Sequence, residues 1–109
     1  MSLNPSPSTT LTKETILHHL RESYPQLIAQ FGVRRIGLFG SFARGTAQES
    51  SDVDLIVEFQ RPIGLKFMEM VEYLETLLGR RVAVLTPTGL RGIRLPEVAR
   101  QIEESIVQV

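Results

Sequence analysis

The chain has 109 residues, of which 42% are hydrophobic and 22% charged, a composition typical of one globular domain rather than a disordered or coiled-coil protein. Its 12 basic and 12 acidic residues cancel, which argues against a long nucleic acid held by this chain alone. The absence of cysteine excludes disulfides and thiolate zinc sites and fits the cytoplasm. No apolar run approaches the roughly 20 residues of a membrane span.

The chain is expected to begin with a flexible tail, residues 1–11, followed by a single domain over residues 12–109. The tail lacks the charged start and apolar middle of a signal peptide. Thr12 is a suitable N-cap for a first helix. Pro25 is expected to end this helix or to start a short second one, which Gly32 closes.

Two short apolar segments predict neighbouring strands. Residues 33–40, VRRIGLFG, form an apolar run that ends in glycine. Residues 52–59, DVDLIVEF, show a two-residue period. One face carries Val53, Leu55, Val57 and Phe59, and the other carries Asp52, Asp54, Ile56 and Glu58. The apolar face requires covering helices, whereas the acidic face must meet water, a metal or a ligand.

The second half of the chain continues the alternation of helix and strand. Residues 64–79 carry apolar side chains at helical spacing and predict an amphipathic helix. Residues 80–86, RRVAVLT, predict a third strand. Pro87 and Gly89 predict a loop.

The C-terminal segment predicts a last helix whose first turn contains Pro96. The helical pattern is expected to run through residues 96–109. Val107 and Val109 give the chain an apolar end. This end packs either on the core or on another subunit, so a homo-oligomer and a hetero-oligomer both stay open.

Asp52 and Asp54 occupy alternate positions of one predicted strand, about 7 Å apart on the same face. Two carboxylates at this spacing repel each other unless a cation lies between them. Magnesium is the natural candidate, because it takes oxygen ligands from one or two carboxylates and completes its shell with waters and phosphates. An Asp-x-Asp pair is common by chance, and acids near a turn are tolerated at a strand edge, so the pair alone is a weak signal.

The Gly40–Ser41 turn supplies the complementary half of such a site. Glycine at a strand end allows the backbone to approach a phosphate, and a helix that begins near Phe42 presents free N–H groups. Ser41 can donate its hydroxyl to the same anion. Cation-binding acids beside a phosphate-binding turn indicate a metal–nucleotide site and the chemistry of phosphoryl transfer.

The stretch GSFARG, residues 40–45, followed by SDVDLIVEF, residues 51–59, resembles the minimal nucleotidyltransferases of the DNA polymerase β-like superfamily. The similarity extends over about residues 33–90. The resemblance implies an α/β (α+β) nucleotidyltransferase fold. This fold has a small mixed sheet with helices packed on one face and the acidic site on the other.

The resemblance also assigns roles to individual residues. Gly40 and Ser41 are implied to hold the triphosphate. Asp52 and Asp54 are implied to be catalytic and to ligate two magnesium ions. Arg44 completes the turn, where it contacts a phosphate, braces the aspartates or forms a structural ion pair, and the sequence leaves these alternatives open.

Ala83 departs from the family pattern, because members usually carry a third carboxylate at this position of RRVAVLT. In the superfamily this acid serves chiefly the metal that activates the attacking hydroxyl, so its absence spares nucleotide binding more than transfer. Glu58 shares the face of Asp54 but lies about 13 Å along the strand, too far to substitute. We therefore expect an attenuated enzyme, or one that a carboxylate of a partner chain completes.

The resemblance implies transfer of a nucleoside monophosphate, AMP from ATP, to a hydroxyl of a partner protein. Family members act as antitoxins of HEPN-domain toxins, so a HEPN-domain protein is the implied partner. The alternative is a non-catalytic module that binds nucleotide and a HEPN-type partner. A purely structural fold would predict drift in the Gly-Ser turn or the aspartates, and both are intact.

Overall fold

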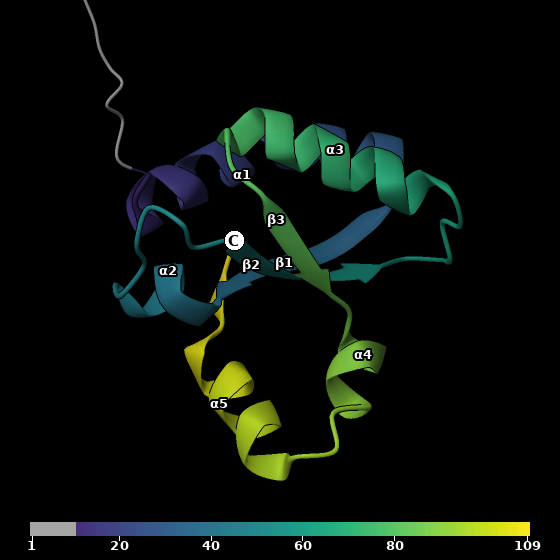
Figure 1. Cartoon of the computed structure of the whole chain (residues 1–109). Coiled ribbons are helices and arrows are strands. Elements are labelled where there is room, and N and C mark those ends of the chain that lie inside the picture. The colour runs from purple at the N-terminus through teal and green to yellow at the C-terminus, as the bar shows by residue number, and fades with distance from the viewer. Residues whose placement is uncertain (1–10) are drawn as a thin grey trace, which may run out of the picture.

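The computed structural model describes residues 11–109. The expected tail, residues 1–11, lies outside this range apart from Leu11, which packs against the core. The described residues form five helices and four strands (Figure 1). In chain order these are α1 (Lys13–Phe31), β1 (Val33–Phe39), α2 (Gly40–Arg44), β2 (Val53–Phe59), α3 (Lys66–Leu78), β3 (Val82–Leu85), α4 (Pro87–Arg91), α5 (Pro96–Ser105) and β4 (Val107–Gln108).

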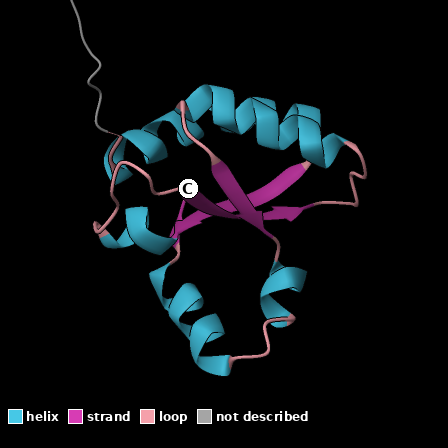
Figure 2. Ribbon diagram, viewed as in Figure 1, coloured by secondary structure: helices cyan, strands magenta, loops and turns pink. Residues whose placement is uncertain are grey.

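The four strands form one mixed sheet in the order β3-β2-β1-β4. The strand β1 pairs antiparallel with both β2 and β4, whereas β2 and β3 are parallel. The parallel pair is joined through α3, because two parallel strands need a crossover connection. Figure 2 shows the twisted strands below α1 and α3. The expected mixed sheet is thereby confirmed.

The core lies between one face of the sheet and the helices α1 and α3. Val53, Leu55 and Val57 of β2 point into it and are each 0% exposed. The helices contribute Ile16, Leu20, Leu27, Met70 and Leu74, all 0% exposed. The two-residue period of β2 therefore predicted its buried face, and burial of these apolar side chains stabilises the arrangement of helices over sheet.

Pro25 neither ends nor starts a helix, which corrects the sequence expectation. The helix α1 continues through Pro25 from Lys13 to Phe31. Proline removes one helical hydrogen bond, but Leu20 and Leu27 on either side of it are fully buried in the same core. Tertiary packing thus outweighs the local preference. Gly32 ends the helix as expected, with a φ of 66°.

The expected loop at Pro87 and Gly89 is wrong, because these residues belong to the short helix α4. The side-chain oxygen of Thr86 accepts a hydrogen bond from the backbone N–H of Gly89 at 3.0 Å and caps the helix. Pro87 stands in its first turn, where a missing N–H costs nothing. The proline and glycine that suggested a loop are therefore parts of a capped turn of helix.

The last helix ends at Ser105 instead of continuing to the C-terminus. The next residues form β4, in which Val107 pairs with Leu38 and Gln108 with Gly37. Val107 and Val109 pack against the core. Of the two expected positions for the apolar end of the chain, the structure shows the one on the core.

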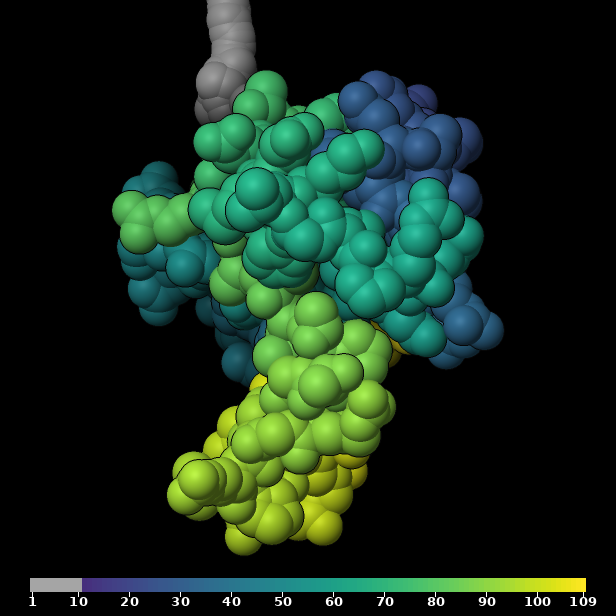
Figure 3. Space-filling model, turned by 90° about the vertical axis from the view of Figure 1, so that its right-hand side faces the viewer, coloured from purple at the N-terminus to yellow at the C-terminus, as the bar shows by residue number. Residues whose placement is uncertain are grey.

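The helices α4 and α5 extend from the sheet on the side away from α1 and α3, as Figures 1 and 2 show. Figure 3 shows them as a lobe that protrudes from the rest of the molecule. The helix α5 has no fully buried residue. Among residues 11–109, no helix combines the length and the apolar character needed to cross a membrane.

Candidate functional site

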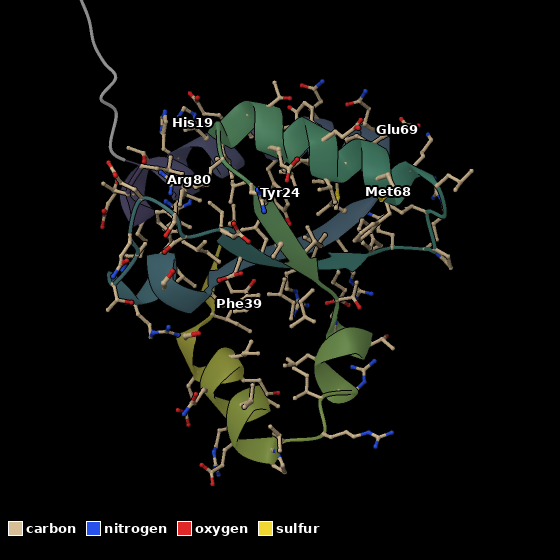
Figure 4. All side chains as sticks on the ribbon, in the orientation of Figure 1. His19, Tyr24, Phe39, Met68, Glu69 and Arg80 are labelled. Atoms are coloured by element: carbon tan, nitrogen blue, oxygen red, sulfur yellow. The ribbon has the colours of Figure 1, made fainter. Side chains whose placement is uncertain are left out.

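The two aspartates lie at the start of β2, beside the end of β1. Asp54 pairs with Phe39, the last residue of β1, in the antiparallel ladder. Gly40 and Ser41 follow directly as the first residues of α2. Asp52 precedes the strand and is exposed, whereas Asp54 is partly buried. The fold brings the expected turn and aspartates together at one end of the sheet, near Phe39 in Figure 4.

Gly40 lies directly against the carboxylate of Asp54. A Cβ atom at residue 40 would overlap Asp54 Oδ2 and would lie 3.0 Å from Asp54 Cγ. The φ of Gly40 is +76°, in the region that side chains other than hydrogen rarely adopt. Glycine is therefore required here both by the backbone conformation and by the neighbouring carboxylate. This contact joins the turn and the strand into one site.

The environment of Asp54 disfavours its negative charge. Partial burial is the main cause that raises the pKa of Asp54, and the charge of Asp52 raises it further. The charge of Arg44 acts in the opposite direction and lowers it. The net effect is a raised pKa of Asp54, so the two carboxylates alone carry an electrostatic cost that a cation between them would relieve.

Arg44 is exposed at the end of α2. Among residues 11–109, none of the ion pairs within 4.0 Å involves this side chain. Of the alternatives left open by the sequence, a structural ion pair is therefore not formed in the described part of the chain. The guanidinium acts on Asp54 through its charge from a distance greater than 4.0 Å.

The carboxylate pair fits magnesium better than a closed zinc site. Magnesium is bound by one or two protein carboxylates and completes its octahedral shell with waters and substrate phosphates. A structural zinc ion requires four protein ligands. Within residues 11–109, no group of three or more acidic, His or Cys side chains is placed to hold a metal. Two repelling carboxylates, one of them partly buried, match the magnesium pattern.

Ala83 lies beside Asp54. The parallel register of β2 and β3 pairs these two residues, so their side chains leave the same face of the sheet. Ala83 is exposed, so a longer side chain there would extend into solvent without a steric clash in the core. Glu58, further along β2, lies 3.9 Å from Arg34 and 3.9 Å from Arg35, measured between charged atoms. It is engaged away from the aspartates.

Two open hollows lie near the site, one lined in part by Asp52 and the other by Arg44. One has a volume of about 480 Å³ and is lined by Asp52, the loop before it and the turn between α3 and β3. The other, of about 520 Å³, lies between Arg44 and the α5 residues Gln101, Glu104 and Ser105. The space around the site is thus bounded by α2, α5 and the α3–β3 turn, and it is open to solvent.

Sequence reasoning missed Arg80, which lies in the α3–β3 turn and is labelled in Figure 4. Its Nη1 atom donates to the backbone oxygens of Gln48 at 3.2 Å, Glu49 at 2.5 Å and Ser51 at 3.1 Å. Its Cζ atom lies 5.5 Å from the centroid of the Phe42 ring. The acceptors are backbone carbonyls, which every residue type carries, so no sequence pattern could have revealed these contacts.

Comparisons with known proteins agree with this geometry. The sequence profile of the nucleotidyltransferase domain matches residues 16–109. The protein adenylyltransferase MntA of Thermococcus cleftensis is 45% identical over 93 residues, covering 84% of this chain and 94% of that protein. A solved structure assigned as a minimal nucleotidyltransferase has a TM-score of 0.70 and 34% identity, covering 93% of this chain and 99% of that chain. A structure of a tri-AMPylated Shewanella oneidensis HEPN toxin with its MNT antitoxin shares the fold, with a TM-score of 0.50, 20% identity, and coverage of 88% of this chain and 66% of that chain.

Proposed function

The chain belongs to the nucleotidyltransferase domain family, and from this premise we propose that it transfers AMP from ATP to a hydroxyl of a partner protein. Protein adenylyltransferase is the name of the relative that is 45% identical to it. The observation that carries the proposal is the contact between Gly40 and Asp54. This contact supports the proposal, because it brings the turn that we propose binds phosphate against the carboxylate that we propose binds a cation.

The proposed roles follow from this arrangement. Gly40 leaves room for the Asp54 carboxylate and offers its backbone to the triphosphate, and Ser41 donates its hydroxyl to a phosphate oxygen. Arg44 adds positive charge at the same end of the sheet. Asp52 and Asp54 would hold magnesium, which when bound neutralises charge on the triphosphate. The acceptor hydroxyl gives up its proton to solvent as its oxygen bonds to the α-phosphorus. The bond from that phosphorus to the oxygen bridging to the β-phosphate breaks, and pyrophosphate leaves.

Ala83 bears on how fast this reaction runs. A third carboxylate at this position would lie beside Asp54 in the sheet. Without it, one of the two metal positions is weakened, so the chain binds nucleotide more readily than it transfers AMP. The proposed enzyme is therefore attenuated, or a carboxylate of the partner protein completes it.

The proposed acceptor is a HEPN-domain protein, with the chain acting as its antitoxin in the cytoplasm. The resemblance of the two motifs supports this partner, and the MNT antitoxin of the Shewanella oneidensis complex shares the fold. The open hollows beside Asp52 and Arg44 leave the site accessible to a macromolecular acceptor. The zero net charge of the chain gives no indication of a nucleic-acid partner.

A second candidate function is a module that binds nucleotide and the partner without transfer, which the Ala83 substitution favours. The two candidates are separated by label transfer from α-phosphate-labelled ATP with magnesium in an extract of the host. For the enzyme, wild type labels a protein band and the double variant Asp52→Asn with Asp54→Asn does not. Absence of any labelled band with wild type, in an extract that contains the partner, would leave only the binding module.

A further inference from the structure

We propose that Arg80 is a positioning residue that holds Asp52 beside Asp54 by anchoring the loop before β2. The inference rests on the proposed function, because it concerns the same carboxylate pair. The guanidinium of Arg80 contacts the loop on one side and Phe42 of α2 on the other, while its backbone leads into β3. It therefore joins the segments that carry Ser41, Asp52 and Ala83.

The loop curves around the end of the Arg80 side chain. The backbone oxygens of Gln48, Glu49 and Ser51 all lie within hydrogen-bonding distance of a single nitrogen, Nη1. Three carbonyl dipoles that point at one place repel each other unless a positive charge lies there. A cationic donor is therefore needed to stabilise this curvature, and hydrogen bonds from a charged group are stronger than those from a neutral one.

The loop has little else to order it. Gln48, Glu49 and Ser50 are exposed, and none of residues 48–51 is buried. Two bonds close the loop internally, from the Ser51 N–H to the Gln48 oxygen at 3.0 Å and from the Gln48 N–H to Ser51 Oγ at 2.9 Å. A segment with few buried contacts opens readily. Asp52 follows directly, outside β2, so its position depends on this loop.

Both the guanidinium and the backbone of Arg80 are held by the folded core. Phe42, whose ring faces the guanidinium, is 4% exposed and adjoins Ser41. The turn that carries Arg80 is tied to α3, because Glu75 Oε2 accepts a hydrogen bond from the Val82 N–H at 3.0 Å. The Arg80 side chain thus links the weakly held loop to the well-packed elements α2, α3 and β3.

The first test compares ATP binding in magnesium and in EDTA for wild type and three variants. Arg80→Met keeps the apolar stem but removes the charge and the donors, and we expect roughly a 10- to 100-fold loss of the magnesium-dependent affinity, as for other residues that support metal ligands. Affinity in EDTA stays unchanged. Arg80→Lys restores donors but not the planar group over Phe42, so it recovers part of the loss. Arg21→Met, at an exposed position of α1, behaves as wild type.

The second test is amide hydrogen exchange in the absence of ligand. In Arg80→Met the Ser51 amide is expected to exchange faster, while the amides of the central strand β2 keep their protection. This result separates loss of the anchor from general destabilisation, which would raise exchange throughout the core. A lowered melting temperature with uniform loss of protection would overturn the positioning role and make Arg80 merely structural.

Unchanged protection at Ser51 together with wild-type magnesium dependence in Arg80→Met would also overturn the inference. Failure of the proposed function looks different. In that case wild type itself gains no ATP affinity from magnesium, and the exchange data alone decide whether Arg80 anchors the loop. Faster exchange confined to residues 48–51 supports the anchor, and unchanged exchange contradicts it.

Discussion

The carboxylate of Asp54 fills the space into which a side chain at residue 40 would project, and the backbone there has a φ of +76°. The same carboxylate is partly buried and repelled by Asp52. The charged form of Asp54 is therefore disfavoured in the metal-free protein. A disfavoured charge is typical of functional sites, where a ligand relieves it. Substitutions of Gly40 and Asp54 therefore test the site most sharply.

Replacing Gly40 with Ala is expected to abolish magnesium-dependent ATP binding, because the added methyl group displaces the Asp54 carboxylate. The positive φ also costs roughly 1–2 kcal/mol of stability. Gly32→Ala is the matched control, since Gly32 has a φ of +66° and no atom within 4 Å of an added Cβ. It loses similar stability but keeps ATP binding. Wild-type ATP affinity for Gly40→Ala in titration calorimetry would contradict this account.

Asp54→Asn is expected to stabilise the metal-free protein at neutral pH. Because the folded-state pKa of Asp54 is raised above 3.8, its contribution to stability is full below that pH and is lost as pH rises through the raised value. The melting temperature of the variant should exceed that of wild type by at most a few degrees at neutral pH, since solvent screens a partly exposed group. Below the unfolded-state pKa the difference disappears.

The opposite pH dependence, with Asp54→Asn destabilised at neutral pH, would show that the carboxylate is favourably paired in the metal-free protein. Magnesium with ATP provides an internal check on the same samples. It stabilises wild type, because a ligand that binds only the folded state raises the melting temperature. It leaves Asp54→Asn unchanged.

Among the elements, apolar periodicity predicted β2 and the helix α3, and short apolar segments predicted β1 and β3. Strand β4 could not be predicted, because two paired residues carry no periodic signal and are fixed by their partners Leu38 and Gly37 in β1. The helix α1 continues through Pro25 because Leu20 and Leu27 are buried in the core. Helix preferences of the local sequence do not take this burial into account. The motifs predicted which residues would gather at the site, whereas the register of the sheet determined how they meet.

The register of β2 and β3 carries its own prediction. Asp54 and Ala83 are partners in the parallel pair, so Ala83→Asp places a third carboxylate beside the other two. We expect this variant to transfer more AMP than wild type in the label-transfer assay, with little change in ATP affinity. Should the partner supply the missing carboxylate, the gain is small, because the partner already completes the site of wild type. A variant that folds normally but gains no transfer, while wild type with the partner also transfers none, would contradict the assignment of Ala83.

In the whole molecule, one part of the sheet holds the core and another part carries the candidate site. One face is covered by α1 and α3 and holds the core, while the start of β2 lies toward α2 and α5 (Figure 1). Net charge and composition predicted a globular protein without a strong grip on nucleic acid. They could not predict the α4–α5 lobe, because α5 buries no residue completely and its position depends on β4.

The most direct test of the central claim is titration of ATP into wild type and into the double variant Asp52→Asn with Asp54→Asn, each with magnesium and with EDTA. The account predicts that wild type binds ATP at millimolar concentration or below only when magnesium is present, and that the double variant loses this dependence while remaining folded. Equal binding by both proteins, or no binding of magnesium–ATP by wild type, would contradict the claim that the Gly40–Ser41 turn and the aspartates form one metal–nucleotide site.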